Sequence, residues 1–60
     1  MKTEQINRLA HSFYAAHGDA AEVEVTHKAS VAEAAGNEAE AEAWRAVRVA
    51  IKELRGAHQG

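Results

Sequence analysis

The sequence lacks two residue types on which many small folds depend. It contains no proline, no cysteine, only four glycines, and one residue each of Trp, Tyr and Phe. The absence of cysteine excludes a disulfide-bonded miniprotein and a cysteine-based zinc module. The absence of proline and the few glycines exclude a collagen-like repeat and a proline-rich linker. No apolar run approaches the roughly 20 residues that a membrane-spanning helix needs.

The first residues of the chain and its net charge indicate the expected cellular location and the expected partners. No positively charged stretch followed by an apolar one opens the sequence, so we expect no signal peptide, no membrane anchor and a cytoplasmic location. The formal net charge of -2 is too close to zero to favour nucleic acid as a partner.

The apolar side chains are few for a stable core. Of the 60 residues, 15 are alanine. Apart from Met1, the larger apolar side chains are Ile6, Leu9, Phe13, Tyr14, Val23, Val25, Val31, Trp44, Val47, Val49, Ile51 and Leu54. A domain of this size buries only about 60% of its unfolded surface and is marginally stable alone. Self-association, or docking on a partner, is the simplest way to bury more apolar surface and so stabilise the fold.

Glycines followed by a capping residue divide the chain. Gly18-Asp19 and Gly36-Asn37 each place a residue suited to a helix C-terminus before one suited to an N-cap. An acid stands three residues after each predicted N-cap, which is the spacing of a capping box: Glu22 and Glu40. We therefore expect a helix to end at each glycine, with Gly56 ending the last one.

These boundaries predict an all-α fold, a compact three-helix bundle with short Gly-capped turns. The predicted helices are 4–17, 20–35 and 38–55. They form a single domain over residues 1–55, followed by a frayed C-terminal tail at 56–60.

The predicted helix at 20–35 has two apolar faces that lie nearly opposite each other. The first carries Ala20, Val23, His27, Val31 and Ala34, and the second carries Val25, Ala29 and Ala32. Such a helix is either packed between two neighbours or offers one face to another chain. We predict a homodimer formed through the second face or through the edge of Trp44.

Two interpretations of the predicted third helix remain open. Trp44 either fills the core against Phe13 or anchors an interface, because Trp and Arg dominate binding hot spots. Four basic side chains lie within an arc of about 80° beside it: Arg45, Arg48, Lys52 and Arg55. This basic strip is either a solvated border of the core or a docking surface for an acidic partner.

A helix-turn-helix DNA-binding motif does not fit. Ala32 and Gly36 match its small residue and its turn glycine, but Asn37 occupies a position that should be apolar. The helix after the turn would also present Glu38 and Glu40 to the phosphates. Nucleic acid is therefore not an expected partner.

The sequence predicts no catalytic, cofactor or metal site. His17 and His27 lack the spacing of a metal motif. Ser12 and Ser30 lack a nucleophile elbow, and no glycine-rich phosphate loop is present. An alanine-rich bundle of this size leaves little room for a small-molecule substrate.

The order of these signals resembles a family of small uncharacterised alphaproteobacterial proteins. The resemblance rests on His17-Gly18, on Gly36-Asn37, and on Ala43-Trp44-Arg45 followed by Val47, Ile51 and Leu54. Members of that family show an HG turn, a GD or GN turn and a single Trp in the last helix. The resemblance covers about residues 9–55. It implies a compact all-α module and assigns no functional residue.

We interpret the chain as a non-catalytic protein-interaction module that acts by covering part of a partner surface. One alternative is an inhibitor encoded by a phage or mobile element, for example an anti-CRISPR-like protein that imitates nucleic acid with acidic residues: Glu33, Glu38, Glu40 and Glu42. Another alternative is a small regulatory or nucleic-acid accessory protein that uses the basic strip.

Overall fold

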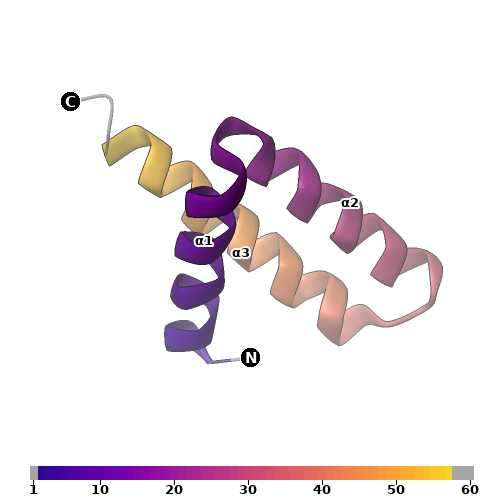
Figure 1. Cartoon of the computed structure of the whole chain (residues 1–60). Helices are drawn as coiled ribbons and strands as arrows, with labels where there is room; N and C mark the ends of the chain where they lie inside the picture. Colours follow the sequence, from indigo (N-terminus) through magenta and orange to yellow (C-terminus); the bar gives the residue numbers. More distant parts are fainter. Residues whose placement is uncertain (1, 58–60) are drawn as a thin grey trace.

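A computed structural model describes residues 2–57, and these residues form helices without any β-strand (Figure 1). The elements are α1 (Thr3–His17), the 3-10 helix η1 (Gly18–Ala20), α2 (Ala21–Ala34) and α3 (Glu38–Ala57). The predicted all-α class is confirmed. Because η1 follows α1 and precedes α2 without a gap, residues 3–34 form one bent helical segment that α3 follows.

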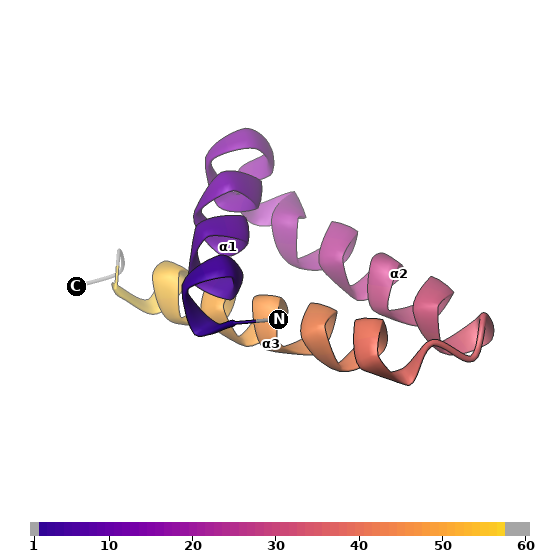
Figure 2. The ribbon, with the colours of Figure 1, turned by 90° about the horizontal axis from the view of Figure 1, so that it is seen from below.

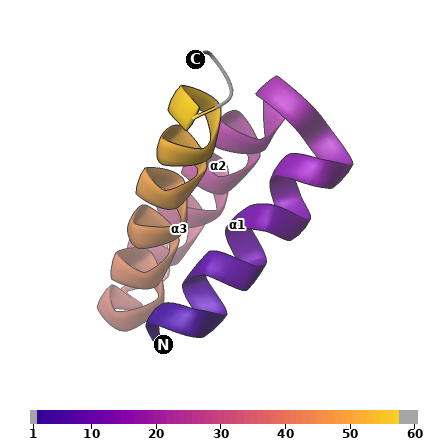
Figure 3. The same ribbon diagram turned by 90° about the vertical axis from the view of Figure 1, so that its left-hand side faces the viewer.

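The helices enclose a small core on one side of a helical hairpin. α2 and α3 run antiparallel, and α1 crosses them near the end of the hairpin that lies farthest from the connection between α2 and α3 (Figures 1 and 2). Seen from the side, α1 lies beside α3, with α2 behind (Figure 3). The molecule measures 38 × 22 × 16 Å along its principal axes. The end of the hairpin where α2 connects to α3 projects beyond α1 (Figures 1 and 2).

The turn at Gly36-Asn37 forms as predicted. Gly36 has a φ of 76°, its amide donates to the carbonyl of Glu33 at 3.0 Å, and the Asn37 amide donates to Ala32 at 2.9 Å. This pair of bonds is a Schellman motif, which needs a left-handed residue at the position of Gly36. The Asn37 Oδ1 then accepts the Glu40 amide at 3.2 Å and caps α3.

The cap at Asn37 gives a direct stability prediction. We expect Asn37→Ala to lower the free energy of unfolding by about 1 kcal/mol, because the Glu40 amide loses its acceptor. Urea unfolding followed by circular dichroism measures the change. Asn7→Ala, at an exposed site inside α1, is the matched control and should not lower the stability, because alanine has the higher helix propensity. Equal urea midpoints for the two variants would contradict the role of the cap.

The predicted boundaries at Asp19 and Gly56 are wrong. Gly18 has the positive φ expected of a terminating glycine, 58°, but η1 follows at once. The residue before α2 is therefore Ala20, whose backbone is already helical and which makes no side-chain cap. Asp19 instead lies near Arg55, with Oδ1 4.0 Å from Nε. α3 continues through Gly56 to Ala57, because a single glycine costs a helix only about 1 kcal/mol.

The predicted frayed tail falls mostly on residues 58–60, which lie outside the described residues.

The core is built around small side chains. Five residues have no exposed surface: Ala10, Ala21, Val25, Val47 and Ile51. The partly buried residues around them all come from α1 and α3: Ile6, Leu9, Phe13, Tyr14, Trp44, Ala50 and Leu54. Alanines at the helix contacts let the three backbones approach closely, which compensates for the scarcity of large side chains.

Candidate protein-interaction surface

The structure buries the face of α2 that we expected to contact a second chain. Val25 is 0% exposed, Ala29 8% and Ala32 5%. Val25 packs in the cluster with Val47 and Ile51 of α3. In this fold these residues are therefore covered by the chain's own helices, and the dimer face predicted from them is corrected.

The opposite face of α2 is the exposed one. Val23 is 71% exposed and Val31 56% exposed, and they are two of the three large apolar side chains exposed among residues 2–57. With exposed neighbours on the same side they form a row that we call the α2 ridge: Ala20, the last residue of η1, and Val23, His27, Val31 and Ala34 of α2. From Ala20 to Ala34 the ridge extends about 21 Å along the helix.

Trp44 belongs both to the core and to the surface. Its indole meets the Phe13 ring edge to face, with 5.9 Å between centroids and 89° between planes. The Lys28 ammonium lies 5.5 Å from the centre of the Trp44 ring, within the range of a cation–π contact. The side chain remains partly exposed. The two interpretations of Trp44 are thus not exclusive, because one part of the ring packs on α1 while another lines a groove.

This groove lies between α2 and the first half of α3, beside the α2 ridge. Its volume is about 400 Å³. The residues that line it are His27, Lys28, Val31, Ala32, Ala35, Asn37, Glu40 and Trp44. His27 and Val31 therefore belong both to the ridge and to the rim of the groove, so the two features form one continuous surface.

The predicted basic strip is partly neutralised by α2. Arg45 forms an ion pair with Glu33, and Arg55 donates to Glu22 Oε1 at 2.8 Å. These contacts join α3 to α2 near the two ends of the hairpin. Within residues 2–57, Arg48 and Lys52 take part in no ion pair. Two of the four cations of the strip are therefore paired with α2, while Arg45 stays exposed in spite of its pair.

The four acidic residues that an inhibitor could use to imitate nucleic acid do not share one environment. Glu33 pairs with Arg45, and the Glu40 carboxylate accepts the Asn37 side-chain amide at 3.2 Å. Glu38 and Glu42 are exposed on the first turns of α3. There they lie near the positive end of the helix dipole, which favours negative charge.

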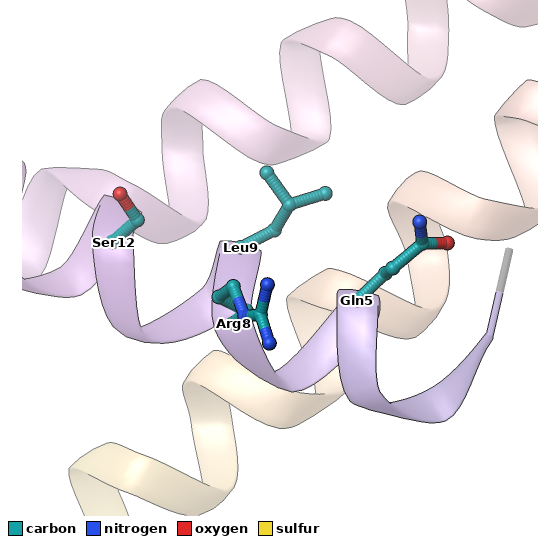
Figure 4. Close-up of a pocket in the computed structure, with 4 residues that line it drawn as sticks. All are labelled: Gln5, Arg8, Leu9 and Ser12. Carbon is teal, nitrogen blue, oxygen red and sulfur yellow. The ribbon is translucent and has the colours of Figure 1, made fainter.

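A separate hollow lies along α1 (Figure 4). Gln5, Arg8, Leu9 and Ser12 line it, and its volume is about 460 Å³. Leu9 points toward a neighbouring helix and supplies the apolar part of the hollow, with the other three side chains around it (Figure 4). All four residues lie on one face of α1, and they form no sequence motif that would have predicted a hollow there.

The two histidines considered for a metal site have different surroundings. The His17 ring lies 5.9 Å from the Phe13 ring at an angle of 32°. His27 lines the groove beside Trp44. Among residues 2–57 there is no cluster of three or more potential metal ligands.

No helix within residues 2–57 is both long and apolar enough to cross a membrane. In comparisons with known proteins, no family model, curated protein or solved structure matches the chain.

Proposed function

We propose that this chain is a small non-catalytic protein-interaction module, a three-helix bundle that acts in the cytoplasm by covering part of a partner protein. Its contact surface is the α2 ridge together with the adjoining groove at Trp44. The observation that carries the proposal is the exposure of Val23 and Val31 on one helix face, at 71% and 56%.

The energetics of burial support this assignment. Each square ångström of apolar surface removed from water contributes about 25 cal/mol, so two exposed valines on one face favour association. Polar residues flank the ridge on both sides, with Glu24 and Lys28 on one flank and Thr26 and Ser30 on the other. Apolar side chains on either side of a central histidine, with a polar rim, match the mixed composition of a reversible protein interface.

Site-specific photocrosslinking tests the proposal. A benzophenone amino acid would replace Val31 in one variant and Val49 in another. Val49, 55% exposed on α3, is the matched control for Val31, which is 56% exposed. In cells that produce the chain, we expect a discrete protein adduct from position 31 and none from position 49. Adducts from neither position, or the same adducts from both, would contradict the proposed surface.

A further inference from the structure

The α2 ridge has the same order of residue types in both chain directions. Its residues are Ala, Val, His, Val and Ala, and the steps between them are three, four, four and three positions. All five are exposed. A contact between two identical chains related by a two-fold axis requires a surface that complements itself, so that residue i meets j while j meets i. A palindromic ridge meets this requirement without any rearrangement.

We propose that the partner of the α2 ridge is a second copy of this chain, bound with the two α2 helices antiparallel. This inference rests on the proposed function, since it names the occupant of the same surface. In this arrangement His27 lies beside the two-fold axis. Val23 of each copy meets Val31 of the other, and Ala20 meets Ala34.

The charges beside the ridge favour the same arrangement. Glu24 and Lys28 are one helical turn apart and lie on the same flank of the ridge. An antiparallel two-fold pair brings equivalent flanks together, so Glu24 of one copy lies beside Lys28 of the other, twice in each dimer. Neither residue forms an ion pair within the part of the chain that the structure describes, and the Lys28 ammonium lies 5.5 Å from the centre of the Trp44 ring. The opposite flank carries the uncharged Thr26 and Ser30.

The size of the ridge determines the kind of dimer to expect. A contact about 21 Å long on one helix of each copy is smaller than a standard protein interface. Association should therefore be reversible and depend on concentration. It should also raise the melting temperature, because only the folded chain presents the ridge.

The first measurement is molar mass by light scattering or sedimentation, from about 1 µM to about 1 mM, a range that covers weak and moderate affinities. We expect the mass to rise from 6.5 kDa toward twice that value. Val23→Asp should weaken the dimer by about tenfold or more, since it places a carboxylate at each end of the contact. Val49→Asp adds the same charge at a comparably exposed site on α3 and should leave the dimer unchanged.

A charge exchange distinguishes the intermolecular pairs from effects on the helix itself. Glu24→Lys alone gives four cations on the joined flanks, and Lys28→Glu alone gives four anions, so each variant should dimerise more weakly than the wild type. An equimolar mixture should form a heterodimer, because every flank pair is then opposite in charge. An effect confined to a single helix would give no preference for the mixed dimer.

Three results would overturn the inference. They are a wild-type mass of 6.5 kDa at every concentration, a dimer that Val23→Asp leaves intact, or a mixture of the charge variants that forms no heterodimer. The proposed function fails separately. If the photocrosslinked adduct from position 31 is heavier than two chains, the interaction surface is correct but its partner is a foreign protein and not a second copy. If no adduct forms at position 31, the proposed interaction surface is wrong.

Discussion

Val25→Asp is expected to unfold the chain at room temperature, because it places a carboxylate where the native side chain has no exposed surface. Val25 packs with Ala21 of its own helix and with Val47 and Ile51 of α3. An unpaired charge buried in such a cluster costs several kcal/mol. The core of a chain this small rarely supplies more than about 3–5 kcal/mol in total. The substitution should therefore consume most or all of the stability.

Thr26→Asp is the control for this prediction. It introduces the same carboxylate one position along the same helix, where the side chain is exposed. The circular dichroism signal at 222 nm, where α-helices give a negative band, should show loss of helix for Val25→Asp. Thr26→Asp should give the wild-type signal. A cooperative melt of Val25→Asp at the wild-type temperature would show that α2 does not pack through this face.

Ile51→Ala is expected to lower the free energy of unfolding by about 3 kcal/mol, through lost burial and the cavity left behind. Ile51 is among the largest fully buried side chains of the described residues. It belongs to the cluster formed with Ala10 of α1 and with Ala21 and Val25. A cavity at this point therefore weakens the contacts of all three helices together.

Urea unfolding at one fixed protein concentration measures this loss, because dimerisation would otherwise shift the midpoint. Val49→Ala removes apolar atoms two positions away on α3, where the side chain is 55% exposed. It should change the stability by no more than about 0.5 kcal/mol. If the two variants had the same midpoint, the assignment of Ile51 to the centre of the core would be wrong.

Local signals in the sequence were sufficient to predict the turn between α2 and α3. A glycine that can adopt positive φ, followed by an asparagine that can cap, stabilises the turn through contacts within six residues. The same logic failed at Asp19. There the helix resumes through η1 immediately after Gly18, and no extended residue remains to act as a cap.

The candidate surface was only half predictable. The sequence showed that α2 has two apolar faces, yet local pattern could not rank them because both are short rows of Ala and Val. The preference that we stated, for Val25, Ala29 and Ala32, was for the face that the structure buries. Similarly, the position of Arg45 and Arg55 on a basic strip said nothing about their ion pairs with Glu33 and Glu22 on another helix.

The sequence by itself determined the helical class and the turn at Gly36-Asn37, because these depend on backbone preferences and on contacts within a few residues. Only the tertiary structure decided which face of α2 is buried, which cations are paired, and where a groove opens beside Trp44. The physical reason is that these properties depend on how the helices lie against one another. The face of α2 that carries Ala21, Val25, Ala29 and Ala32 is small enough to let α3 approach closely. Burial of that face leaves Val23, His27 and Val31 on the outside.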